Sequence, residues 1–142
     1  MILIHPFARP LRDGRKNPKD YPHWKELLSM IDEDIIQIGV EGEEQLVNDF
    51  RKNLTLDELA ELVKRCRTWI GVDSFFQHFC WDLNKSGIVL WGQSDPNIFG
   101  HAENINLLKD RKYLRKDQFL IWDSAIYMQE AFVQPAEVVK YL

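Results

Sequence analysis

The chain has 142 residues, 45% of which are hydrophobic, and it carries a formal net charge of −4. This content and length predict a single folded domain over residues 1–142 rather than a disordered chain. The acidic balance argues against a nucleic-acid binder that relies on overall charge, and no apolar run approaches the ~20 residues that a membrane span needs.

A short buried strand, Ile2–Ile4, opens the chain and ends at His5 and Pro6. Residues 7–21 then form a loop that is long for a compact domain, and loops of that length are often functional. A cluster of cations in such a loop suits a diphosphate or a carboxylate, and a solvated basic loop is the alternative. The cations of this loop are Arg9, Arg12, Arg15, Lys16 and Lys19.

A helix is predicted next, because Pro22 suits a first helical turn and apolar residues recur on one face up to about Glu33. The strand that follows, residues 35–40, leads into an acidic turn. In nucleotide-binding folds a carboxylate soon after a strand often holds ribose hydroxyls, and Glu41, Glu43 and Glu44 follow this strand. A plain exposed turn is the alternative, since three acids crowd the same segment.

Residues 45–53 are ambiguous, and the expected element there is a short strand around Leu46-Val47. Thr55 and Glu58 form a capping box, with Thr as the N-cap and Glu three residues later. This box predicts a helix that runs to about Cys66 and has a structural role.

The next stretch has the pattern of a parallel βαβ unit. Trp69–Val72 is a buried strand, an amphipathic helix begins after Ser74, and Gly87–Trp91 is a second buried strand. A helix that starts at Ser74 offers unpaired backbone N–H groups and a favourable dipole to an anion such as a phosphate. Asp73, Ser74 and the loop after Trp91 lie at the carboxyl ends of strands, where open α/β sheets bind ligands. A helix cap without a ligand is the alternative.

The C-terminal third has a weaker pattern. Residues 105–108 are the candidate last strand, the charged residues 109–118 are expected to be exposed, and Phe119–Trp122 are expected to pack on the sheet. Pro135 suits the start of a final helix.

Together these elements predict an α/β fold, namely a Rossmann-like parallel sheet of about five strands with helices on both faces. Strands 2–5, 35–39, 69–72 and 88–91 are expected to lie side by side. Strands and helices alternate from the first strand to the strand before Gly92, which favours parallel crossover connections.

The N-terminus has neither the basic region nor the cleavage site of a signal peptide, and Cys66 and Cys80 are isolated thiols. His78 and Cys80 are not a credible zinc site, because no other ligand pair accompanies them. We therefore expect a cytoplasmic protein with no metal and no cofactor.

The stretch from Ile70 to Gly100 resembles the second half of glycosyltransferase family 9, the heptosyltransferases that build lipopolysaccharide cores. The matching pieces are Ile70-Gly71-Val72-Asp73-Ser74, His78, the strand Ile88–Trp91, the turn Gly92-Gln93-Ser94-Asp95-Pro96, and Gly100. Earlier pieces match as well, namely His5, Ala8, Lys19, Pro22 and Trp24 in that order, Gly39 with Glu43, and residues 53–59. The chain departs from the family at Phe75, where the family has a Gly that lets the backbone approach the phosphates.

This resemblance implies the C-terminal half of a GT-B glycosyltransferase, a nucleotide-sugar-binding domain that corresponds to residues 2–100. It implies that Lys19 contacts the donor diphosphate, that Glu43 holds the ribose, and that the helix start at Ser74 helps to neutralise the phosphates. No metal is implied, because these groups can stabilise the leaving diphosphate. The implied donor-binding residues are His5, Arg9, Lys19, Glu43, Asp73, Ser74, His78 and Asp95.

Two functions are compatible with the resemblance. The first is a glycosyltransferase-like domain that binds the donor but lacks the acceptor half, which in the family carries the general base. The second is a non-catalytic module that binds a nucleotide or nucleotide sugar to regulate or sequester it, and Phe75 favours it. In both cases we expect a partner, either a second copy of the chain or a separate acceptor-domain protein, because a half-enzyme exposes an apolar face.

Overall fold

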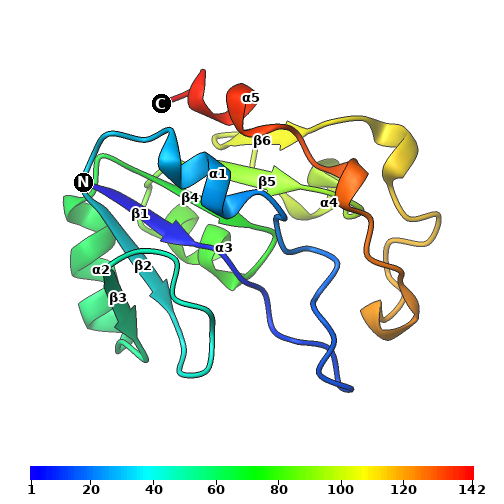
Figure 1. Ribbon diagram of the computed structural model, residues 1–142, viewed down its shortest axis with the longest axis horizontal. Coiled ribbons are helices and arrows are strands. Elements are labelled where there is room, and N and C mark those ends of the chain that lie inside the picture. The colour runs from blue at the N-terminus through cyan, green and yellow to red at the C-terminus, as the bar shows by residue number, and fades with distance from the viewer.

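Six strands form one sheet in the computed structural model, which describes residues 1–142 (Figure 1). All neighbouring strands are parallel, in the order β3-β2-β1-β4-β5-β6. The predicted Rossmann-like sheet is confirmed, and the four strands expected side by side are neighbours. The candidate last strand, residues 105–108, lies at one edge, and a strand at residues 49–52 lies at the other. The strands are β1 (Ile2–His5), β2 (Ile35–Gly39), β3 (Asp49–Lys52), β4 (Thr68–Val72), β5 (Ile88–Trp91) and β6 (Ile105–Leu108).

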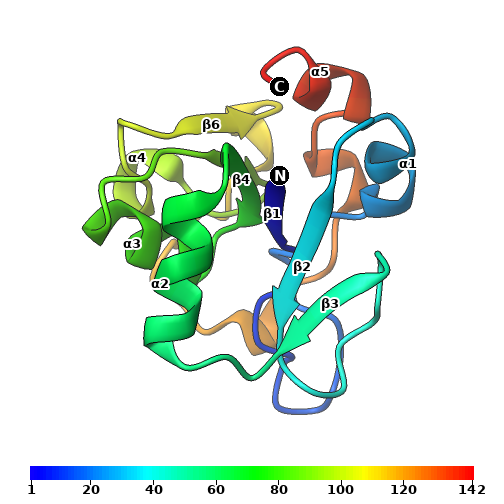
Figure 2. The same cartoon turned by 90° about the vertical axis from the view of Figure 1, so that its left-hand side faces the viewer.

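Helices cover both faces of the sheet, as Figure 2 shows. The helices are α1 (Trp24–Ser29), α2 (Leu56–Arg65), α3 (Phe75–Asp82), α4 (Pro96–Phe99) and α5 (Pro135–Val139). One buried apolar layer contains side chains of α1 and α5, and the other contains side chains of α2 and α3. Three short 3-10 helices, at Arg111–Tyr113, Trp122–Ser124 and Gln129–Ala131, lie in the C-terminal segment.

The alternation of side chains along the strands builds these two layers. In β1, Ile2 and Ile4 belong to the layer of α1 and α5, whereas Leu3 between them belongs to the layer of α2 and α3. In β4, Ile70 and Trp69 divide between the same two layers. Because the sheet is buried on both faces, its central strands are continuous apolar runs, which is why the sequence pattern revealed them.

The predicted helix that begins with a capping box is confirmed as α2. The Thr55 hydroxyl accepts a hydrogen bond from the Glu58 N–H (3.2 Å), and the Glu58 carboxylate accepts one from the Thr55 N–H (3.3 Å). By contrast, α1 ends at Ser29 and not near Glu33. Its last turn closes with a hydrogen bond from the N–H of residue 30 to the Leu27 carbonyl (3.0 Å).

Two expectations about strands and packing were wrong. The strand expected around Leu46-Val47 lies at Asp49–Lys52, and it is an edge strand whose charged side chains give no apolar signal. Leu46 and Val47 pack against the layer of α1 and α5 instead. The segment Phe119–Trp122 does not pack on the sheet, since Phe119 is 78% exposed.

The order of the strands places a crevice at the carboxyl ends of β1 and β4. From β1 the chain continues to β2 and β3 on one side of the sheet, and β4 to β6 lie on the other side. The strands β1 and β4 are neighbours, and the loops that follow them lead to opposite sides of the sheet. The crevice between two such loops is the position where open α/β sheets bind ligands.

Candidate functional site

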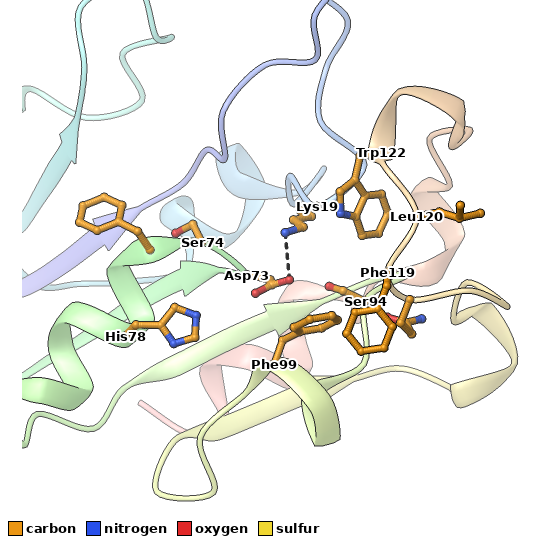
Figure 3. Close-up of a pocket in the computed structure, with 11 residues that line it drawn as sticks. Lys19, Asp73, Ser74, His78, Ser94, Phe99, Phe119, Leu120 and Trp122 are labelled. Carbon is orange, nitrogen blue, oxygen red and sulfur yellow. Dashed lines mark ion pairs between the residues drawn. The ribbon is translucent and has the colours of Figure 1, made fainter.

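A cavity of about 430 Å³ lies at this crevice, and we call it the first cavity (Figure 3). Its polar lining consists of Lys19, Asp73, Ser74, His78, Ser94 and Gln118. Its apolar lining consists of Phe75, Phe99, Phe119, Leu120 and Trp122. The structure thus brings together four of the predicted site residues, which come from the loop after β1 and from the start of α3.

Lys19 and Asp73 form an ion pair inside the first cavity, with 3.2 Å between Nζ and Oδ2 (Figure 3). The Asp73 side chain is only 7% exposed, and its other oxygen accepts a hydrogen bond from Gln77 Nε2 (2.9 Å). The backbone N–H of Lys19 donates to Asn17 Oδ1 (2.9 Å), which fixes the loop at this point. An ammonium group has three donors, so this positioned cation can bind an anion in addition to Asp73.

Ser74 caps α3, and its hydroxyl contacts the ring of His5. The Ser74 hydroxyl accepts a hydrogen bond from the Phe76 N–H (3.4 Å) and lies 3.3 Å from His5 Nδ1. The buried His5 ring stacks on the Phe76 ring, with 5.0 Å between centroids. Burial lowers the pKa of His5 to about 4, so the ring is neutral near pH 7. His5 therefore positions Ser74 but does not line the first cavity.

His78, one turn further along α3, pairs with a second histidine. Its Nδ1 lies 2.7 Å from His101 Nε2, and the His101 ring stacks on Trp81 with 4.7 Å between centroids. Burial and the neighbouring His101 lower the pKa of His78, while Asp73 partly opposes this shift. Since Nδ1 is engaged with His101, Nε2 is the ring nitrogen that remains for a ligand.

Glu43 lies in a second cavity, of about 570 Å³, between the loops after β1 and β2. A Cβ added at Gly39 would meet the Glu43 carboxylate, so Gly39 leaves room for this side chain in its present position. Burial raises the pKa of Glu43, and Asp20 in the same cavity adds to this shift. Burial also raises the pKa of Asp20 to about 6. Glu43 Oε2 is buried beside Gly39 and has no hydrogen-bond partner in the protein.

Gln37, a fully buried residue of β2, holds the loop that carries Glu43. Its Nε2 donates to the Glu44 carbonyl (2.8 Å), and its Oε1 accepts from the Leu46 N–H (2.7 Å). The two cavities flank the same loop after β1, because Lys19 lines the first and Asp20 lines the second.

Three predicted site residues line neither cavity, namely His5, described above, Asp95 and Arg9. Asp95 caps α4, where Oδ1 accepts from the Asn97 N–H (2.9 Å), and it forms a bidentate pair with Arg111 (2.8 and 3.2 Å). The Arg111 guanidinium lowers the pKa of Asp95. Both Asp95 oxygens are thus engaged within the protein. The Arg9 side chain is exposed, and only its carbonyl is bonded, to Asn17 (2.8 Å).

The sequence profile of glycosyltransferase family 9 (heptosyltransferase) matches residues 2–118. The chain belongs to glycosyltransferase family 9. The matched region contains all eight residues that the resemblance implied for donor binding. No curated protein sequence matches the chain.

The fold of this family 9 domain is similar to two solved heptosyltransferases. One is the E. coli heptosyltransferase WaaC with ADP, which is 19% identical with a TM-score of 0.57 over 74% of this chain. The other is the dodecameric iron-containing heptosyltransferase TibC in complex with ADP-D-β-D-heptose, which is 15% identical with a TM-score of 0.63 over 89% of this chain. The chain spans 36% of the length of each of them.

Sequence reasoning missed the C-terminal contribution to the first cavity of this family 9 domain. Phe119, Leu120 and Trp122 line it, together with Gln118, which accepts a hydrogen bond from the Asp95 N–H through Oε1 (2.8 Å). Three large apolar residues directly after a charged run were the available signal, because such residues rarely gather on a surface without a function.

Two further properties of the family 9 domain concern membranes and metals. None of its helices has both the length and the apolar composition that crossing a membrane requires. Nowhere do three or more His, Cys, Asp or Glu side chains gather so that they could hold a metal ion.

Proposed function

We propose that this domain binds the nucleotide-sugar donor of a glycosyltransferase, with the diphosphate in the first cavity and the nucleoside in the second. The observation that carries the proposal is the convergence of Lys19 and the Ser74 helix start on one cavity at the ends of β1 and β4. ADP is a suitable probe, because WaaC was solved with ADP and TibC with ADP-D-β-D-heptose.

The charges of the first cavity suit a diphosphate that becomes a leaving group. The Lys19 ammonium and the N–H groups at the start of α3 would stabilise the negative charge that develops when the sugar leaves. Asp73 would repel a phosphate, so we assign it to hydroxyl groups of the sugar. Its hydrogen bond from Gln77 and its ion pair with Lys19 hold it in place for that role.

Isothermal titration calorimetry with ADP and adenosine tests the proposal directly. We expect ADP to bind more tightly than adenosine, because only ADP presents a diphosphate to Lys19. If neither ligand binds, or if adenosine binds as tightly as ADP, the assignment of the diphosphate to the first cavity is refuted.

Transfer of the sugar would require an acceptor site beside the first cavity, and we propose that a partner supplies it. Phe75, Phe119 and Leu120 line this cavity and are each more than half exposed, so they form an apolar rim that a partner surface would cover. Sedimentation velocity should show a dimer, or a partner should co-purify from the native host. A strict monomer without a co-purifying protein would contradict this.

A non-catalytic binding module is the second candidate, and Phe75 at the position of the family's Gly is the observation that favours it. Phe75 is the first residue of α3, and its side chain lines the first cavity at a position where the family's Gly has no side chain. An assay for release of ADP from ADP-D-β-D-heptose, with the partner present, separates the two functions. Binding without ADP release would identify a module that only holds the nucleotide sugar.

Replacing Glu43 with alanine is expected to lower the affinities for adenosine and for ADP by the same factor. The reason is that Glu43 lines the second cavity, where we place the nucleoside, and both ligands carry the ribose. A hydrogen bond to a charged group contributes ~1.5–3 kcal/mol, so the loss should be about tenfold or more for each ligand. Calorimetry on both ligands measures this. A loss confined to ADP would place the diphosphate, and not the nucleoside, near Glu43.

The affinity for ADP is expected to rise as the pH falls from 8 to 6, and His78 is the reason. The pKa of His78 is lowered in the free protein by burial, by His101 and by Lys19, against the opposing effects of Asp73 and Asp82. A bound diphosphate raises that pKa, so binding takes up a proton, and the gain is at most about tenfold per pH unit. Calorimetry at several pH values measures the slope. The same titrations with His78→Gln give the slope that comes from the ligand's own ionisation, and the difference between the two slopes is the contribution of His78. Equal slopes for both proteins would exclude His78 as the cause of the pH dependence.

A further inference from the structure

We propose that Trp122 is the surface on which the donor sugar stacks, so that this residue selects a nucleoside diphosphate sugar over the bare nucleoside diphosphate. This inference rests on the proposed donor-binding function. Trp122 lies beyond residues 2–118, the region that matches the family profile. The sugar platform would therefore be a feature of this chain and not of the shared motifs.

The first cavity has two different ends, and Trp122 belongs to the aromatic one. In Figure 3, Ser74 and His78 lie at one end, the ion pair of Lys19 and Asp73 lies between, and Trp122 lies at the other end with Phe119 and Phe99. Phe99 and Phe119 pack edge to face, with 5.7 Å between ring centroids. A diphosphate would not require this group of aromatic side chains, because phosphate oxygens bind to cations and N–H donors.

Trp122 is held in position by the segment around it. The guanidinium carbon of Arg115 lies 3.9 Å from the centroid of the indole ring. The same guanidinium donates to the Leu120 and Ile121 carbonyls (3.0 and 3.1 Å), while the Arg115 N–H donates to the Gln93 carbonyl after β5 (2.9 Å). The platform is thus tied to the sheet before a ligand arrives, which lowers the entropic cost of binding.

Lys19 links the diphosphate site to this platform. Its ammonium lies 3.2 Å from Asp73 Oδ2 and 5.4 Å from the centroid of the Trp122 ring. A phosphate bonded to Lys19 would therefore place its next substituent beside the indole. A sugar suits this position, because its C–H face can lie on an aromatic ring while its hydroxyls reach Asp73, Ser94 and Gln118.

Calorimetry with ADP-D-β-D-heptose and with ADP, on the wild type and on Trp122→Ala, tests the proposal. We expect the variant to bind ADP-D-β-D-heptose about three- to tenfold more weakly than the wild type, and ADP within about twofold of it. Trp122→Phe should restore most of the affinity, because it keeps an aromatic face. The matched control is Ile126→Ala, since Ile126 is 80% exposed on the same segment and does not line the first cavity. It should bind both ligands like the wild type.

Three results would overturn the inference. If the wild type binds ADP-D-β-D-heptose no more tightly than ADP, there is no sugar site to assign. Equal losses on both ligands in Trp122→Ala would show that the indole acts on Lys19 or the base, and unchanged affinities would show that it contacts neither. In these cases ADP still binds and the proposed function stands, whereas a wild type that binds neither ligand refutes the proposed function and this inference together.

Discussion

Replacing Lys19 with alanine is expected to raise the Kd for ADP by about tenfold to over a hundredfold, which corresponds to the ~1.5–3 kcal/mol of a charged hydrogen bond. The Kd for adenosine should hardly change, because adenosine has no phosphate to meet the ammonium. The variant also leaves Asp73 in the first cavity without its cation, and its side chain is only 7% exposed. The remaining carboxylate would repel the diphosphate, so the loss should lie toward the upper end. Calorimetry with the two ligands measures the difference.

Lys116→Ala is the matched control for Lys19→Ala, because it removes the same charge from an exposed residue that does not line the first cavity. It should leave both Kd values near those of the wild type, apart from a small salt-dependent effect on ADP. Equal losses for ADP and adenosine in Lys19→Ala would mean that the lysine only shapes the loop after β1. The diphosphate would then have to be assigned elsewhere.

The sheet could be predicted because its central strands are buried on both faces. Runs such as Ile88–Trp91 are apolar throughout, and the cap residues Thr55 and Ser74 mark the starts of α2 and α3. Strand β3 could not be located, because Asp49–Lys52 has an exposed, charged surface and its position depends on pairing with β2. Tertiary hydrogen bonds, and not local pattern, determine such an edge strand.

The candidate site was predictable only in part, for a related reason. Asp73 and Ser74 follow β4 directly, and Lys19 lies in the loop after the neighbouring β1, so the sheet brings these two segments to the same edge. The contact of Lys19 with Asp73 also depends on how that loop folds. The engagement of Asp95 depends on Arg111, sixteen residues further along and outside any regular pattern. The separation of Glu43 into its own cavity depends on how the loop after β1 folds, since loop conformation follows contacts that spacing does not encode.

The structure of the C-terminal segment was the hardest to predict, because single anchor residues hold it in place and no periodic pattern marks it. Its 3-10 helices have three residues each and its side chains show no helical or strand period. Tyr127 and Tyr21 tie it to the loop after β1, since the Tyr127 hydroxyl donates to the Asp20 carbonyl (2.7 Å) and the Tyr21 hydroxyl donates to the Val133 carbonyl (2.8 Å). The wall of the first cavity and the loop of Lys19 are thus parts of one packed unit.

Phe132 is the main apolar anchor of that unit, and replacing it with alanine is expected to lower the free energy of unfolding by about 3–5 kcal/mol. The ring is fully buried and packs near Tyr21 and Tyr127, with centroid distances of 5.8 and 6.3 Å. It lies so close to Gly92 that a Cβ added there would be 2.5 Å from the ring Cζ, so the space is already filled. Truncation would leave a cavity between the C-terminal segment and the sheet. Urea denaturation measures the change.

Phe119→Ala is the matched control for Phe132→Ala, because the same atoms are removed from a ring that is 78% exposed. Its free energy of unfolding should stay within about 0.5 kcal/mol of the wild type. If Phe132→Ala also stayed within about 1 kcal/mol, the C-terminal segment would not be anchored through this ring. The position of Trp122 beside Lys19 would then not be fixed before the ligand binds, and the contribution of preorganisation to sugar selection would be lost with it.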